Sequence, residues 1–201
     1  MQARASGILL PVFSLPGPYG IGTLGKPARQ FIDFLAAGGQ KFWQILPLVP
    51  PGGGNSPYMS PSSFAGNPLF LDLDELAEEE LLTQDELRSA CRDNPDRVDY
   101  AGLHETRLPL LRKAFERGRA KYAAQLKEFE EQEKDWLPDY ALFLALKDHF
   151  GGKELADWPD EARLRRPKAM EQYRTELAEA CAFQVFLQYL FFRQWKAVKT
   201  Y

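Results

Sequence analysis

The stretch Lys41-Phe-Trp-Gln-Ile-Leu-Pro-Leu48 decides the fold class, because it is a nearly continuous apolar run that ends at Pro47. Such a run is typical of a strand buried on both faces, as in a parallel sheet or a barrel. A long loop rich in proline and glycine, residues 49–68, follows it directly. Loops of this length are usually functional or disordered, and in parallel α/β folds ligands bind at the loops that follow the strands. We therefore expect an α/β fold with a ligand-binding loop at 49–68.

The residues before this strand predict one extended segment and one helix. Gly7–Phe13 is a short apolar run that reads as an extended segment and a candidate strand. Pro27 suits the first turn of a helix, an apolar stripe at helical spacing follows it, and Gly38 and Gly39 end the pattern.

The composition of the chain changes near residue 71. Residues 1–71 hold ten of the fifteen prolines and eleven of the fifteen glycines, with Asp33 as the only carboxylate. From residue 72 onward the sequence is charged and periodic, which predicts helices. The expected helices cover about 73–81, 84–92, 101–118, 121–134 and 138–150, with a last one from Pro167 to the end.

The last predicted helix has a wide apolar face that still continues in the turn before Tyr201. A helix of this kind needs a partner surface, and one buried strand cannot close a sheet. We interpret the chain as the N-terminal piece of a longer protein. The alternative is a complete small helical domain whose last helix frays.

Composition and charge exclude several function classes. A net charge of −3 and a pI of about 5.5, without a basic block, argue against nucleic-acid binding. No apolar run is long enough for a signal peptide or a membrane span. Cys91 and Cys181 are too few and too far apart for a disulfide framework or a zinc site. These features predict a reduced, cytoplasmic protein.

The sequence does not support a dinucleotide site at the glycine motif or a metal site at the histidines. Gly20-Ile-Gly-Thr-Leu-Gly25 has the spacing of a dinucleotide fingerprint, but no acidic residue lies about 20 positions later, near Ile45. We interpret this segment as a glycine-rich turn that packs closely against its neighbours. His104 and His149 have no spaced partners, and we expect no metal site.

The carboxylates after residue 72 occur in runs such as Glu78-Glu79-Glu80, which are typical of solvated helix faces. Glycosidase carboxylates occur singly and flank a cleft. If the protein acts on carbohydrate, its catalytic acids therefore lie outside this chain.

The loop at 49–68 has the composition of a sugar-binding segment. Tyr58 could pack on a pyranose face, and the nearby serines and asparagines could bond to sugar hydroxyls. The alternative is a proline-stiffened loop in which Tyr58 and Phe64 fill the core.

Several motifs in this order resemble the N-terminus of the 4-α-glucanotransferases, also called amylomaltases or disproportionating enzymes. The first are Arg4-x-Ser-Gly-Ile-Leu-Leu-Pro11 and Ser14-Leu-Pro-Gly-Pro-Tyr-Gly-Ile-Gly-x-Leu-Gly25. Others are Phe42–Leu48, Asn55–Tyr58, Phe64–Pro68, Leu108–Phe115, Tyr140–Gly152 and Phe186–Trp195. The resemblance extends over almost the whole chain.

The resemblance implies an α/β fold, namely the N-terminal part of a (β/α)8 TIM barrel with an inserted helical subdomain, mostly α by residue count. Residues 1–71 would begin the barrel, with Lys41–Leu48 as its first strand and 49–68 as its substrate loop. Residues 72–166 would form the inserted subdomain, and the long helix 167–201 would return to the barrel.

The resemblance also implies an activity, the retaining transfer of α-1,4-glucan segments between maltooligosaccharides, without a metal or organic cofactor. The catalytic acids of the family would lie beyond Tyr201, so this chain alone is expected to be inactive. The expected partners are maltooligosaccharides and α-1,4-glucans, with no nucleic acid and no membrane. Unpaired apolar surface would also promote self-association. The alternative function is a non-catalytic glucan-binding or interaction module.

Four site residues carry over from the family. Tyr58 matches a tyrosine that stacks on the donor sugar, and Ser56 matches a hydroxyl that lines the same subsites. Asn67 is assigned to substrate binding within its Gly-Asn-Pro motif, where we expect it mainly to shape the loop. Tyr100 matches a position linked to a second glucan site in some members, but Gly53 stands where the aromatic partner would be. Asn55 replaces an aspartate that is frequent in the family.

Overall fold

The computed structural model describes residues 4–92 and 97–201, which form two compact units. The first unit contains the described residues up to Gly118 together with Leu190–Tyr201, and the second contains Arg119–Tyr189. Helix α9 (Ala178–Thr200) contributes residues to both units. These units do not coincide with the expected segments, which end at residues 71 and 166. The assignment of those segments to a barrel and an insertion stays a prediction.

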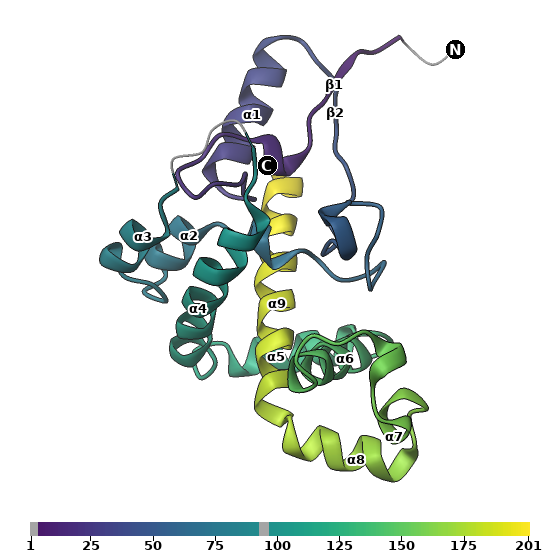
Figure 1. The fold of residues 1–201 in the computed structure, drawn as a ribbon. Coiled ribbons are helices and arrows are strands. Elements are labelled where there is room, and N and C mark those ends of the chain that lie inside the picture. Colours follow the sequence, from purple (N-terminus) through teal and green to yellow (C-terminus); the bar gives the residue numbers. More distant parts are fainter. Residues whose placement is uncertain (1–3, 93–96) are drawn as a thin grey trace. The chain divides into compact units, whose positions relative to one another are not determined.

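The first unit begins with a strand–helix–strand motif (Figure 1). Strands β1 (Gly7–Leu9) and β2 (Phe42–Gln44) pair in parallel, with Gly7 opposite Phe42. Helix α1 (Lys26–Ala37) connects them and has Pro27 in its first turn, as predicted. A side chain at Gly7 would overlap the backbone of Phe42, so the strands approach closely only because this residue is glycine.

The prediction of a strand buried on both faces at 41–48 is wrong in this structure. Strand β2 covers only three residues, none of residues 41–48 is buried, and Phe42 is 64% exposed. It is also not the first strand, because β1 precedes it. In the described part of the chain the sheet has two strands, and Ile8, Leu9 and Phe42 on them are exposed. Phe31 of α1 does contact Trp43, with 5.1 Å between the ring centroids.

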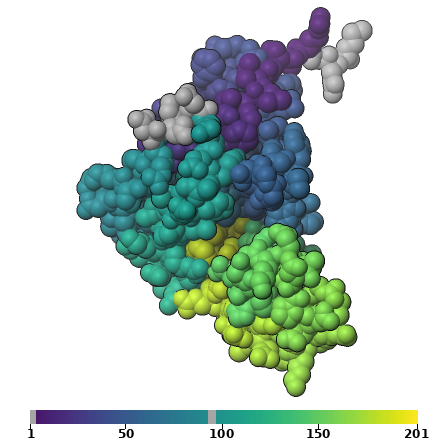
Figure 2. All heavy atoms as spheres, in the orientation of Figure 1, coloured from purple at the N-terminus to yellow at the C-terminus, as the bar shows by residue number. Residues whose placement is uncertain are grey.

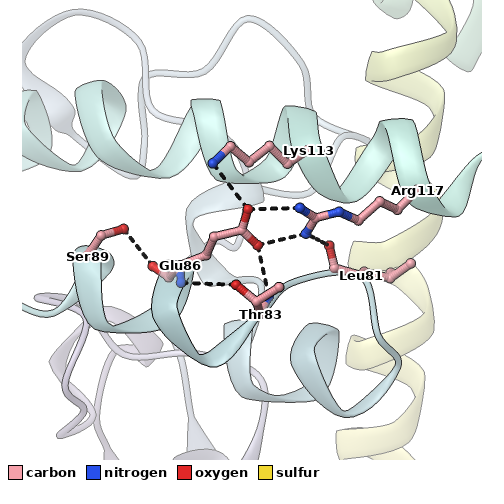
Figure 3. Close-up of polar contacts among 6 residues, drawn as sticks. All are labelled: Leu81, Thr83, Glu86, Ser89, Lys113 and Arg117. Carbon is pink, nitrogen blue, oxygen red and sulfur yellow. Dashed lines mark hydrogen bonds and ion pairs between the residues drawn. The ribbon is translucent and has the colours of Figure 1, made fainter.

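Three helices follow in the first unit, close to their predicted positions. They are α2 (Leu73–Glu78), α3 (Gln84–Ala90) and α4 (Tyr100–Gly118). The side chain of Thr83 accepts a hydrogen bond from the amide of Glu86, and the Glu86 carboxylate accepts one from the amide of Thr83. This capping box starts α3, and Figure 3 shows that the same carboxylate also meets Lys113 and Arg117 of α4.

The second unit is helical. It contains α5 (Ala123–Gln132), α6 (Leu137–His149), α7 (Asp160–Arg163), α8 (Pro167–Glu176) and the first half of α9. Its core includes Leu142, Leu146, Trp158, Ala162 and Met170. Glycines in left-handed conformation follow α6, at Gly151 and Gly152, as the predicted helix end requires.

The predicted single helix from Pro167 to the end is broken at Leu177. Helix α8 ends at Glu176, Leu177 follows as its C-cap, and α9 starts at Ala178. Met170 lies in the core of the second unit, and Tyr173, Leu177 and Cys181 pack against that core. No proline or glycine marks this position in the sequence. The break therefore follows from tertiary packing, which periodicity alone does not reveal.

No described helix combines the length and the apolar composition needed to cross a membrane.

Candidate functional site

The tip of the 49–68 loop is closed by its own hydrogen bonds. The amide of Gly52 donates to the carbonyl of Met59 at 2.5 Å, and the amide of Met59 donates to the carbonyl of Ser56 at 3.1 Å. Gly54 and Asn55 take left-handed backbone conformations in this turn. Asn55 can hold this turn because asparagine tolerates positive φ better than most residues.

Tyr58 lies at this tip and is 74% exposed. Met59 and Phe64 on the same loop are also exposed. In the space-filling view the residues near position 50, in blue, form part of the surface (Figure 2). The alternative in which Tyr58 and Phe64 fill the core is therefore wrong for this structure. An exposed ring on a tight turn is suited to stacking against the apolar face of a ligand.

Ser56 shapes the turn that presents Tyr58. Its hydroxyl oxygen accepts a hydrogen bond from the Tyr58 amide at 3.3 Å. A hydroxyl that accepts one bond still has a proton to donate. Ser56 can therefore hold the turn and donate to a ligand oxygen at the same time.

Asn67 lies at the base of the loop and is 3% exposed. Its side-chain oxygen accepts a hydrogen bond from the Leu69 amide at 3.0 Å, which caps the short turn Pro68–Phe70. Its own amide donates to the carbonyl of Leu48 at 2.8 Å, which joins the two ends of the loop. Through these hydrogen bonds Asn67 shapes the loop. A direct contact of Asn67 with sugar stays a prediction.

Tyr100 is the first residue of α4 and is half-buried, and this burial raises the pKa of its hydroxyl. Gly53 has open space around its Cα, without a ring that could pair with Tyr100. The second glucan site stays a prediction.

Arg107 of α4 is a buried cation that sequence analysis missed. Its Nη2 donates to the carbonyl of Leu71 at 2.5 Å, and its guanidinium lies 6.0 Å from the centre of the Tyr19 ring. Burial lowers its pKa to about 10, and Asp72 and Tyr19 act in the opposite direction. Arg107 lies four residues after Leu103, on the buried face of α4. This helical spacing is the sequence pattern that could have predicted its burial.

The glycine motif at 20–25 serves packing. A side chain at Gly22 would overlap the carbonyl of Val12, and one at Gly25 would overlap the carboxylate of Asp72. The interpretation as a tightly packed turn is confirmed. Within residues 4–92 and 97–201, no cluster of three or more histidine, cysteine or acidic side chains could hold a metal ion.

Comparison with known proteins gives the family. The family model described as 4-alpha-glucanotransferase matches residues 10–201. The chain belongs to the 4-alpha-glucanotransferase family. It is 46% identical to the 4-alpha-glucanotransferase of Thermus thermophilus over 98% of this chain and 39% of that relative. It is 44% identical to the Clostridium butyricum enzyme of the same name, over 94% of this chain and 39% of that relative.

Solved structures agree with this family assignment. The amylomaltase of Streptococcus agalactiae in complex with acarbose matches with a TM-score of 0.93 and 42% identity. This match covers 98% of the present chain and 41% of that amylomaltase. The chain therefore spans about two-fifths of the length of the 4-alpha-glucanotransferases that it matches.

Proposed function

We propose that this chain is the N-terminal portion of a 4-alpha-glucanotransferase that moves α-1,4-glucan segments between maltooligosaccharides. The observation that carries the proposal is a continuous match from residue 10 to residue 201 with relatives of which the chain covers about two-fifths. The proposed fold of the whole protein is a TIM barrel, of which β1, α1 and β2 form a starting βαβ unit.

The proposed reaction is a retaining double displacement. A carboxylate attacks the anomeric carbon while an acid protonates the leaving oxygen, and a sugar 4-hydroxyl then replaces water as the second nucleophile. In residues 4–71 the only carboxylate is Asp33, and its Oδ1 accepts a hydrogen bond from the Tyr201 hydroxyl at 2.8 Å. Because the chain also covers only about two-fifths of the length of its relatives, we assign the catalytic acids to the part of the protein outside this chain, and binding to the loop at 49–68.

In this proposal Tyr58 stacks on the donor sugar and Ser56 donates to one of its hydroxyls. The support is the exposure of the Tyr58 ring and the turn that Ser56 closes beneath it. A related amylomaltase has been solved in complex with acarbose, which supports a carbohydrate ligand for the protein as a whole.

The test is Tyr58→Ala in the protein extended to the length of its relatives. Loss of the stacking ring should lower kcat/KM for maltotriose at least tenfold, because each ~1.4 kcal/mol of lost transition-state stabilisation is a factor of ten. Tyr58→Phe keeps the ring and should retain most of the activity. Thermal unfolding should not change for either variant, since the side chain is exposed. Unchanged kcat/KM in Tyr58→Ala would remove the stacking role.

The exposed ring also supports the alternative of a glucan-binding module. Under the main proposal, calorimetry of the 201-residue chain with maltoheptaose should show weak binding and no disproportionation. Tight, saturable binding by this chain alone would favour the module instead.

A further inference from the structure

The base of the loop is held by a helix from the far end of the chain. The side-chain oxygen of Gln194 on α9 accepts a hydrogen bond from the Asp72 amide at 2.8 Å. The side-chain nitrogen of Gln194 donates to the Asp72 carbonyl at 3.2 Å. Both residues are buried and lie 122 positions apart. Gln194 thus satisfies both backbone groups of one residue, as a neighbouring strand would.

A second contact from α9 lies at Gly66. The ring of Phe191 occupies the place that a side chain at Gly66 would fill. Phe191 and Gln194 are three residues apart on α9, so they lie on the same face of the helix. One face of α9 therefore meets the loop base at residue 66 and again at residue 72. We call residues 65–72 the stem of the loop.

Other elements complete the stem. Arg107 of α4 donates to the carbonyl of Leu71, and the hydroxyl of Thr23 donates to the carboxylate of Asp72 at 2.6 Å. In contrast, the hydrogen bonds described at the tip join residues that are close in sequence, such as Gly52 with Met59 and Ser56 with Tyr58. The tip carries the exposed ring, whereas the stem fixes where the loop leaves the core.

We infer that Gln194 and Phe191 are positioning residues for the loop, so that α9 determines the orientation in which Tyr58 is presented. The effect of this positioning on sugar binding by Tyr58 rests on the proposed function. The positioning of the loop by α9 is independent of it.

The test compares Gln194→Met with Arg193→Gln in the 201-residue chain. Methionine keeps the length and volume of glutamine but removes both hydrogen bonds to Asp72. Arg193 is the matched control, because it also lies on α9 and donates a hydrogen bond at 2.7 Å to the carboxylate of Glu79, the residue that follows α2. Phe191→Leu is a second variant in case Gln194→Met does not fold.

The readouts are amide hydrogen exchange at Asn67 and Leu69 by NMR, and the linewidth of a fluorotyrosine at position 58. Neither amide bonds to Gln194, so both report on the stem as a whole. We expect exchange at least about tenfold faster and a changed fluorine signal in Gln194→Met or Phe191→Leu, but not in Arg193→Gln. A role in stability alone would change the melting temperature and accelerate exchange equally across the first unit. That uniform pattern, or no change at the stem, would overturn the inference.

Maltotriose titration of the same samples separates the two proposals. We expect the fluorine signal of the unsubstituted chain to shift with maltotriose and the apparent Kd to rise several-fold in Gln194→Met. If the unsubstituted chain shows no shift while stem exchange responds as expected, maltotriose binding by this chain alone fails and the positioning by α9 stands. The sugar role of Tyr58 is then decided by Tyr58→Ala in the extended protein.

Discussion

Glu86 of α3 and Arg117 of α4 form a two-point ion pair, with carboxylate-to-guanidinium distances of 2.7 and 2.9 Å (Figure 3). Lys113 lies 3.1 Å from the same carboxylate, and the amide of Thr83 donates to it at 2.8 Å. Arg117 also donates to the carbonyl of Leu81 at 2.9 Å. A single carboxylate therefore starts α3 and attaches it to α4.

Replacing this carboxylate should destabilise the first unit. Glu86→Gln keeps the shape of the side chain but removes the charge that Arg117 and Lys113 share, and we expect a loss of about 1–3 kcal/mol in the free energy of unfolding. Urea denaturation followed by circular dichroism measures it. Asp85→Asn is the control, since Asp85 forms an exposed pair with Arg88 on the same helix and should change stability by less than about 0.5 kcal/mol.

The contribution of Glu86 should depend on pH. The hydrogen bonds from Arg117 hold the pKa of the Glu86 carboxyl well below its usual range, although burial acts in the opposite direction. A pKa lowered by folding adds stability above the unfolded pKa of about 4.3, and this stability is lost as the pH falls toward the folded pKa. The unfolding free energies of the unsubstituted chain and Glu86→Gln should therefore differ at pH 7, and the difference should shrink progressively as the pH falls below about 4. A difference that stays constant from pH 7 to pH 3 would contradict this assignment.

Two glycines in the candidate loop should respond oppositely to alanine. Gly66→Ala places a methyl group against the Phe191 ring, and overpacking of this kind costs about 1–3 kcal/mol. Gly53→Ala meets no atom within 4 Å and should be neutral or slightly stabilising, because alanine restricts the unfolded chain. Melting temperatures of the two variants measure the contrast. Equal melting temperatures would show that Phe191 moves away at little cost.

The exposed apolar side chains around the sheet should promote association of the 201-residue chain. Phe34 and Phe42 are both largely exposed in the first unit. Sedimentation velocity at increasing concentration should show a rising mean mass, and Phe42→Lys should reduce this rise. Leu155→Lys, at an exposed position in the second unit, should not. A monomer at every concentration would count against the association.

The mass of the protein made by its source organism tests the proposal that the chain is a portion of a longer enzyme. Because the relatives are about two and a half times as long as this chain, we expect an intact mass more than twice 22.9 kDa by denaturing mass spectrometry. A mass of 22.9 kDa would contradict the proposal and favour glucan binding without catalysis.

The elements with strong local signals were predictable. Pro27 and the glycines at 38 and 39 mark both ends of α1, and Thr83 marks the start of α3. The loop at 49–68 was also predictable as the candidate site, because prolines, glycines and an aromatic ring follow an apolar run directly. These features were predictable because each depends on residues that are close together in the sequence.

Features that depend on distant residues were not predictable in the same way. The apolar run at 41–48 is the same whether other strands cover it or not, and only the structure shows that Phe42 is exposed. The break at Leu177 follows from packing in the second unit, and the burial of Arg107 follows from the position of the Leu71 carbonyl.

The sequence by itself therefore determined the helix ends that carry a cap, a proline or a glycine, together with the tight turns of the loop, because capping and backbone geometry act over a few residues. Its motifs also identified the family. Only the tertiary structure decided that Tyr58 is exposed while Asn67 is buried, and that Gln194 holds the stem at Asp72. The physical reason is that burial and pairing of polar groups depend on segments up to 122 residues apart, whose contacts no local pattern encodes.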